Sequence, residues 1–315
     1  MVEDARRRAL ELDFWSEPVT LRSLSAGPSG HRFLADDGME HYIVHIGDDL
    51  PEHMVYRYNE IAVSQAAHEA GLSPALLHYE PGALGFEYDP DARATDADDL
   101  AQPANMDRLI GLLGQCHLDL PGRLEVPGPM FWVFHLNRRY ARLIMQHGAA
   151  LTSAPASSLA RLMALNDELE AAIGAIEPVF CHNNLAIDTV LDNGEQFFLT
   201  QWQYGGWNDG LYDLASLATN LDLEAGAAED MLHRYRQLTG EDADQTSRRR
   251  FAAWKSAALI WSGLWGGVGA MFPNPGSVSG SVPGSVLGAD HFDYTLYSQQ
   301  RLDRLEATIA EFRSI

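Results

Sequence analysis

Apolar and polar residues alternate through much of the first hundred positions, which is the pattern of half-buried β-strands. Residues 18–37, PVTLRSLSAGPSGHRFLADD, predict two strands joined by a Gly/Ser loop, and residues 40–49, EHYIVHIGDD, predict a third strand that stops at Gly47. Residues 74–90, PALLHYEPGALGFEYDP, predict a hairpin around the turn EPGA. Residues 1–90 are therefore expected to form a β-rich lobe of about five strands.

Apolar residues recur every three or four positions, the period of an α-helix, in one N-terminal segment and in most of the chain after residue 100. Residues 57–72, RYNEIAVSQAAHEAGL, predict a helix that ends at Gly71. Residues 91–100 are acidic and predict a linker, and residues 101–315 predict a mainly helical lobe. The expected fold class is α+β, with a small β-rich N-lobe and a larger helical C-lobe. Its predicted helices lie within residues 105–120, 131–148, 157–176, 212–221, 228–240, 248–265 and 294–314.

One uncharged segment, residues 256–272, SAALIWSGLWGGVGAMF, is nearly long enough to span a bilayer. Its glycines and serines favour a buried core helix instead, so no membrane partner is expected. The next segment, residues 273–288, PNPGSVSGSVPGSVLG, predicts a flexible loop from its Gly, Ser and Pro content. Two hypotheses remain open for this loop: a lid over a cleft, or a surface insertion.

Composition narrows the classes of partner. The net charge of −22 argues against nucleic acid, because phosphate binding needs clustered cations, and it favours cationic or metal-associated small ligands. Among the 22 basic residues, Lys255 is the single lysine. Cys116 and Cys181 are far apart without a C-x-x-C motif, which indicates buried thiols in a reducing compartment. The N-terminus lacks a signal-peptide pattern, so a cytoplasmic protein is expected, and a homo- or hetero-oligomer is left open.

The segment 181–194, CHNNLAIDTVLDNG, interrupts the helical pattern with short β-like runs around an Asn-Gly turn. With TQWQYGGWNDGLYDLASL, which follows it, the segment has the spacing of a kinase catalytic loop, H-x-D-x-x-x-x-N, and of the metal-binding strand after it. His182 occupies the His position, but Asn184 stands at the Asp position and Thr189 at the Asn position. Gln201 stands where the downstream metal-binding Asp is expected.

These segments resemble the choline/ethanolamine kinase branch of the aminoglycoside phosphotransferase (protein-kinase-like) superfamily. The matching motifs are HNNLAIDTVL, LTQWQYGGWND and LYDLASLATN. Residues 42–82 and 291–312 also look like bacterial members of that branch, so the resemblance covers nearly the whole chain. It implies a two-lobe protein-kinase-like fold, with ATP as the expected nucleotide, and a catalytic-type loop at residues 181–204.

The resemblance assigns nucleotide contacts to the N-lobe. Gly27 and Gly30 would lie over the phosphates, although an ordinary glycine turn explains them equally well. His45 stands where kinases place a Lys or Arg against the phosphates, and Glu60 would orient it. A neighbouring Glu60 would favour a protonated His45 at mildly acidic pH.

The resemblance gives His182 and Asp213 a structural role, in which Asp213 braces the loop, and it makes Asn184 the replacement of the catalytic base. Thr189 and Gln201 replace the two magnesium ligands. Magnesium is usually held by carboxylates and phosphates, so neutral groups should lower its affinity severely, and we expect Mg²⁺ binding to be lost. Losing a positioned base costs a factor of about 10² to 10⁴ in rate.

Two carboxylates could compensate for these changes. Asp188 and Asp192 lie close to the loop in sequence and could serve as displaced metal ligands. The alternative is that both are solvent-exposed carboxylates beside the Asn-Gly turn.

The substrate side keeps its aromatic residues. Trp265 falls where choline kinases carry an aromatic wall for the quaternary ammonium, and Trp202, Tyr204 and Trp207 follow the loop. Aromatic faces attract such cations, so the resemblance implies a small quaternary or primary amine ligand. The alternative is that Trp265 and Trp261, four residues apart on one helix, are core residues.

The leading hypothesis is a degenerate choline kinase-like protein, that is, a pseudokinase or a kinase fold turned to other chemistry. It would bind a small amine and, if the cleft is intact, a nucleotide. One alternative is an active ATP-dependent small-molecule phosphotransferase. Another is a non-catalytic scaffold subunit of an active homologue.

Overall fold

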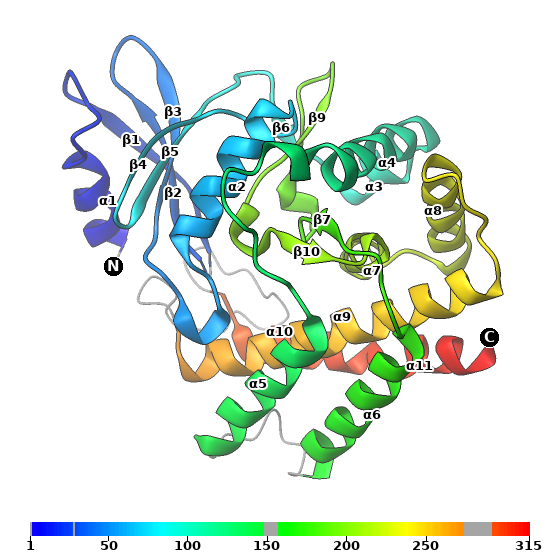
Figure 1. The fold of residues 1–315 in the computed structure, drawn as a ribbon. Coiled ribbons are helices and arrows are strands. Elements are labelled where there is room, and N and C mark those ends of the chain that lie inside the picture. Colours follow the sequence, from blue (N-terminus) through cyan, green and yellow to red (C-terminus); the bar gives the residue numbers. More distant parts are fainter. Residues whose placement is uncertain (1, 28, 148–156, 274–291) are drawn as a thin grey trace.

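The computed structural model describes residues 2–27, 29–147, 157–273 and 292–315 and has two lobes, as predicted. The small lobe is built on a five-stranded antiparallel sheet with the strand order β1-β2-β3-β5-β4 (Figure 1). The predicted strand, loop, strand pattern and the hairpin at Pro81–Gly82 are confirmed. The strands are β1 (Thr20–Gly27), β2 (Gly30–Asp36), β3 (His41–Ile46), β4 (Leu76–Glu80) and β5 (Ala83–Glu87).

The two faces of this sheet have different neighbours. Helix α1 (Val2–Leu10), which the sequence pattern did not predict, covers one face and packs on Phe33 and Val44. Successive side chains of a strand point to opposite faces. The residues next to Phe33 and Val44, among them Arg32 and His45, therefore point to the other face, which borders the cleft between the lobes.

Helix α2 (Arg57–Glu69) connects the small lobe to the large one. The helix ends as predicted, because Gly71 has a φ of +74° directly after the Ala70 C-cap. Its buried Val63 and Ala67 belong to the hydrophobic core of the large lobe and not to the core beneath α1. The helix is therefore fixed by the lobe that carries the loop.

The predicted linker at residues 91–100 has regular structure. Strand β6 (Arg93–Ala94) pairs with β8 (Val190–Asp192), which in turn pairs with β9 (Phe197–Leu199) around the predicted Asn-Gly turn. Helix α3 (Ala97–Ala101) starts at a capping box in which Asp96 and Asp99 exchange hydrogen bonds. The linker thus joins the sheet of the catalytic-type loop.

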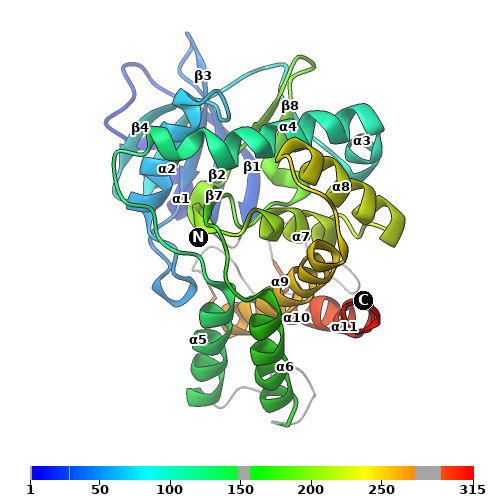
Figure 2. The same ribbon diagram turned by 45° about the vertical axis from the view of Figure 1, so that its right-hand side comes forward.

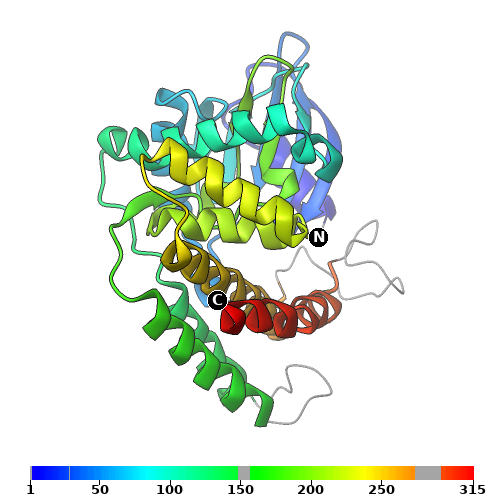
Figure 3. The ribbon, with the colours of Figure 1, turned by 90° about the vertical axis from the view of Figure 1, so that its right-hand side faces the viewer.

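The large lobe is helical, as predicted. Helices α3 and α4 lie together above α7, with α8 beside them (Figure 2), and α5 and α6 run side by side away from α9 (Figure 3). The helix predicted at residues 294–314 is interrupted at Arg304 and therefore forms two helices, α10 and α11. The helices after α3 are α4 (Pro103–Leu118), α5 (Val133–Gln146), α6 (Ser157–Ile173), α7 (Gly210–Asn220), α8 (Ala225–Leu238), α9 (Gln245–Met271), α10 (Tyr294–Asp303) and α11 (Leu305–Ser314), and two short strands, β7 (Val179–Cys181) and β10 (Gly206–Asn208), pair beside α7.

Helix α9 contains most of the uncharged segment 256–272 and is buried along most of its length between α5, α6, α7, α10 and α11. This confirms the prediction of a core helix. Among the described helices, none is both long and apolar enough to cross a bilayer. The loop predicted at residues 273–288 lies, except for Pro273, outside the described residues.

Candidate functional site

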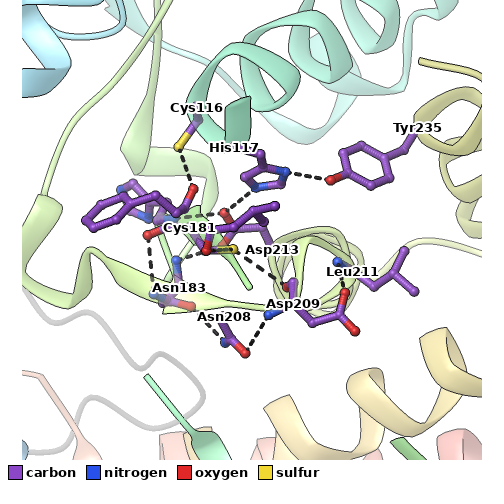
Figure 4. Close-up of polar contacts among 12 residues, drawn as sticks. Cys116, His117, Cys181, Asn183, Asn208, Asp209, Leu211, Asp213 and Tyr235 are labelled. Carbon is purple, nitrogen blue, oxygen red and sulfur yellow. Dashed lines mark hydrogen bonds and ion pairs between the residues drawn. The ribbon is translucent and has the colours of Figure 1, made fainter. Parts of the chain in front are cut away.

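The catalytic-type loop is held by Asp213, which projects from the first turn of α7 (Figure 4). The fully buried Asp213 carboxylate accepts hydrogen bonds from the backbone N–H groups of His182 (2.8 Å) and Asn183 (2.6 Å). His117 of α4 lies 3.1 Å from the same carboxylate through Nε2 and 2.7 Å from the Tyr235 hydroxyl through Nδ1. Because the carboxylate can only accept, Nε2 donates to it, and in the neutral ring Nδ1 then accepts from the Tyr235 hydroxyl. The bracing role expected for Asp213 is what this geometry provides.

Asn183 fixes the loop from its other side and was not singled out by the sequence pattern. Its φ of +66° is in the left-handed region, which asparagine tolerates better than most residues. Its side-chain amide donates to the carbonyl oxygens of Tyr204 (2.9 Å) and Gly206 (3.1 Å), and its Oδ1 accepts from Asn208 (2.8 Å). The loop backbone is thus tied to the segment that follows Gln201.

His182 links the loop to the end of β9. Its Nε2 lies 2.8 Å from the carbonyl oxygen of Thr200, and its Nδ1 accepts from the backbone N–H of Asn184 at 3.3 Å. Burial lowers the pKa of His182 below its usual value, although Asp213 acts in the opposite direction. This imidazole is a neutral structural link.

Potential metal-ligating atoms of three buried residues, Cys116, His117 and Asp213, lie within 4.8 Å of one another. Each of these atoms already has a protein partner: His117 and Asp213 bond each other, and the Cys116 thiol donates to the Phe180 carbonyl at 3.5 Å. Burial raises the pKa of the Cys116 thiol well above its usual range, so it is not a thiolate ligand. The group is a hydrogen-bond network.

The two positions expected to hold magnesium are occupied by groups engaged with the protein. The buried Thr189 hydroxyl donates to the Ala186 carbonyl (2.7 Å) and accepts from the Ala186 N–H (3.0 Å). The Gln201 side-chain amide donates to the backbone carbonyl and to the carboxylate of Asp188, both at 3.1 Å. The amide oxygen of Gln201 is a neutral ligand, and Asn184 adds no charge either. The residues present therefore do not fit the carboxylate-rich site that Mg²⁺ prefers.

The two candidate compensating carboxylates lie in different places. Asp188 is exposed and lines the cavity between the lobes together with Gln201. Asp192 accepts from Arg108 at 3.0 Å and from the Gly194 N–H at 2.9 Å, and it does not line the cavity. Of the pair, Asp188 alone is positioned to contact a ligand there.

A cavity of about 760 Å³ lies between the small sheet and the catalytic-type loop. Apolar side chains of both lobes line it, among them Leu24, Ile43, Leu191 and Phe198. Its polar lining residues include Arg22, Arg32, His45, Glu60, Asp188 and Gln201. The volume is in the range of pockets that hold molecules of drug size, about 300–1,000 Å³.

Gly27 and Gly30 lie at the β1–β2 turn but do not line this cavity. Gly30 has a φ of +145°, and a Cβ there would lie 2.3 Å from the carbonyl oxygen of Ile46, so the turn requires glycine. The carbonyl of Ser29, next to Gly30, accepts a hydrogen bond of 2.5 Å from Arg57. The turn thus packs on the connection between β3 and α2.

His45 does not have the charge that the sequence suggested. Glu60 forms an ion pair with Arg57, while its Oε1 is 3.9 Å from His45 Nδ1. Burial, followed by repulsion from Arg57 and Arg32, holds the pKa of His45 well below its usual value. The expectation that Glu60 favours a protonated His45 is wrong, because His45 is buried and because Arg57 pairs with Glu60 and adds its own positive charge.

The four expected substrate aromatics separate into three places. Trp265 donates from Nε1 to the Tyr204 hydroxyl at 2.9 Å, and Trp265 is partly exposed. Trp202 is buried against His182 and lines the interlobe cavity, whereas Trp207 packs on Phe180. Of the four aromatic residues, only Trp265 and Tyr204 therefore contact each other.

Trp265 stands among further rings from α10, from Phe292 just before α10, and from the 3₁₀ helix η1 (Pro51–His53). Its ring centroid lies 5.0 Å from that of His53, 5.5 Å from Tyr294, 5.7 Å from Tyr297 and 5.9 Å from Phe292. Trp261, one turn earlier, is a buried core residue, in line with the alternative considered for it. Trp265 is not fully buried and could contact a ligand.

The whole fold is similar to solved kinases of small alcohols. A choline/ethanolamine kinase family protein from Mesorhizobium loti matches with a TM-score of 0.74 and 21% identity, covering 100% of both chains. The choline kinase LicA from Streptococcus pneumoniae matches with a TM-score of 0.74 and 18% identity, covering 100% of this chain and 99% of that one. Solved macrolide and aminoglycoside phosphotransferases share the fold.

Similarity at the level of sequence is more local. Protein LicA of Haemophilus influenzae is 33% identical over 61 residues, which span 19% of this chain and 23% of that relative. No family model matches the chain. The fold is thus that of the solved choline/ethanolamine kinases, which confirms the expected two-lobe fold class.

Proposed function

We propose that this chain is a degenerate choline kinase-like protein that binds a nucleotide in the interlobe cavity without Mg²⁺ and transfers no phosphate at a useful rate. The observation that carries the proposal is the hydrogen bond from the Gln201 amide to Asp188. The Gln201 position, where the resemblance implies a metal-binding Asp, holds a neutral amide, and the Asp188 carboxylate is engaged with that amide.

The chemistry of phosphoryl transfer supports this proposal. Catalysis of that reaction consists mainly of positioning and of neutralising charge on the transferred group. Asn184 cannot accept a proton as a carboxylate does, and neither Thr189 nor Gln201 supplies negative charge for a cation. The loop keeps its shape through Asp213 while the groups that would do the chemistry are neutral.

The nucleotide part of the proposal is supported by the cavity. Its apolar walls suit a base, and its cationic and hydrogen-bonding residues suit a sugar phosphate. A solved LicA structure in complex with AMP is similar to this chain, with a TM-score of 0.72 and 19% identity over 99% of this chain and 98% of that one. ATP, ADP and AMP are therefore the first ligands to test.

The second ligand we propose is a small cationic amine at Trp265. The ring faces around Trp265 can attract a quaternary ammonium by cation–π interaction, worth about 0.5–2 kcal/mol. Choline binding followed by fluorescence tests this. Trp265→Leu should weaken binding, whereas the matched Trp207→Leu should not, and equal loss in both variants would count against an amine site at Trp265.

Calorimetric titration of the protein with ATP, once in EDTA and once in MgCl₂, tests the main proposal. We expect dissociation constants that agree within about threefold, a difference of about 0.6 kcal/mol. ADP release with choline, ethanolamine or an aminoglycoside as acceptor should stay at the background without acceptor. Tight ATP binding that requires Mg²⁺, with turnover that chelation abolishes, would overturn the proposal.

One observation favours a second candidate, an active phosphotransferase with a displaced ligand. Asp188 lines the same cavity as Gln201 and is exposed, so a rotation of Gln201 would release its carboxylate. In that case Asp188→Asn should abolish turnover. If no turnover is found in the unaltered protein, this candidate is excluded.

A further inference from the structure

Arg32 of β2 lies directly across from His45 of β3 in the antiparallel pair. The neighbouring residues Phe33 and Val44 are fully buried beneath α1. Because alternate residues point to opposite faces, Arg32 and His45 point together toward the cleft, and both line the interlobe cavity. The strand register thus brings an arginine to the place where His45 stands.

The Arg32 guanidinium has no hydrogen bond and no ion pair within the part of the chain that the structure describes. The carboxylates facing it are already engaged, because Glu60 is paired with Arg57 and Asp188 accepts from Gln201. Arg57 itself is satisfied by Glu60 and by the carbonyl groups of Ser29 and Gly47. Arg32, opposite His45, is therefore free to bind a ligand, as is the exposed Arg22 of β1, which also lines the cavity.

Arg32 is half-buried, so its unpaired charge is only partly solvated, and an anionic ligand would offset that cost. Burial lowers the pKa of Arg32, while the charges of Asp188 and Glu60 raise it, yet a guanidinium stays charged at any ordinary pH. Its planar set of N–H donors matches two phosphate oxygens at once. The free group is thus suited to a phosphate and not to a second amine.

We propose that Arg32 is the phosphate-binding cation of this cleft, supplied by β2 in place of the residue at His45 on β3. The proposal rests on the proposed function, since it names the residue that would hold the phosphates of a nucleotide in the interlobe cavity. It also gives the unpaired arginine a reason to lie beside Arg57 despite their like charges.

The test compares Arg32→Gln with Arg7→Gln, which removes the same charge from exposed α1 on the far face of the sheet. Calorimetry with ATP, adenosine and tripolyphosphate in EDTA separates phosphate from base. Arg32→Gln should weaken ATP binding about 10- to 100-fold, which is the range for the loss of a charged hydrogen bond. Adenosine binding should stay within about twofold of that of the unaltered protein. Arg7→Gln should change neither.

Equal losses for ATP and adenosine would show that Arg32 acts only through the shape of the cavity, and unchanged ATP binding would also overturn the proposal. If the unaltered protein binds no nucleotide, the proposed function fails. The proposal for Arg32 is then tested by tripolyphosphate alone, which the unaltered protein should bind and Arg32→Gln should not. Thermal unfolding without ligand checks the fold, and removing an unpaired cation should leave the Tm equal to or above that of the unaltered protein.

Discussion

Four buried histidines, His31, His45, His53 and His182, have pKa values below the usual value of the imidazole, in each case first through burial. The pKa of His53 falls to about 4. When pH falls, the unfolded chain takes up protons near pH 6.5 while the folded chain does not. Their contribution to stability is therefore complete above pH 6.5 and is lost as the pH falls toward the folded pKa.

We predict that His53→Phe reduces this acid sensitivity. Between pH 7.5 and pH 5, protonation of His53 in the unfolded chain should account for about 2 kcal/mol of lost unfolding free energy. Phenylalanine keeps an aromatic ring beside Trp265 and Tyr140 but cannot titrate. Urea unfolding at both pH values measures the change, with exposed His233→Phe as the control. An unaltered loss in His53→Phe would mean that His53 is not the titrating group.

At the level of single residues, sequence spacing located His182 and Asp213 but not the contacts that decide the chemistry. Spacing along the chain places a residue in a motif and does not show what its side chain bonds. The pairing of Gln201 with Asp188, and of Glu60 with Arg57, follows from how the loop and α2 fold. Arg32 could be recognised only from the register between two strands.

Among the elements, the contact of α9 with α10 depends on glycine. A Cβ on Gly266 would lie 2.9 Å from the backbone oxygen of Tyr294 and 3.1 Å from the backbone nitrogen of Ser298. These are backbone atoms, so the two helices would have to move apart. This contact sets where α10 places Tyr294 and Tyr297 around Trp265.

We predict that Gly266→Ala lowers the free energy of unfolding by about 1–3 kcal/mol through overpacking. Gly111→Ala, in the middle of α4 with open space around the added Cβ, should instead raise it by about 0.5–1 kcal/mol, since alanine favours a helix. Urea unfolding of both variants gives the comparison. Stabilisation by Gly266→Ala would contradict the close approach of α9 and α10.

The periodicity of apolar residues predicted most strands and helices, because each buries one face. It missed α1, whose nine residues include three arginines and few apolar side chains. It also took the acidic residues 91–100 for a linker, since the short β6 is ordered by pairing with β8, a partner distant in sequence. Contacts of that kind leave no local pattern.

The described residues of the molecule form two hydrophobic cores, one on each side of the small sheet and the cavity that it borders. The small core lies between α1 and the sheet, and the large core includes α2 and the C-lobe helices. The loop keeps its bracing network although its chemical groups are neutral. We propose that the site is intact in shape and lacks only the groups that bind metal and take a proton.

A variant that restores those groups tests this proposal. The variant combines Asn184→Asp, Thr189→Asn and Gln201→Asp, and His45→Lys is left out because Arg57 and Arg32 already lie beside that position. The control, Gln196→Asp, adds a carboxylate to the same cavity away from these three positions. A ligand that binds only the folded state raises the Tm, so thermal shifts with ATP, with and without Mg²⁺, provide the readout.

The triple variant should show a Tm that rises with ATP more in Mg²⁺ than in EDTA, while the unaltered protein and Gln196→Asp show no such difference. Each single replacement should do little, because a metal site needs most of its ligands together. A folded triple variant without a Mg²⁺-dependent shift would contradict the claim that only these groups are missing. A Mg²⁺-dependent shift in the unaltered protein would contradict the claim that they are missing at all.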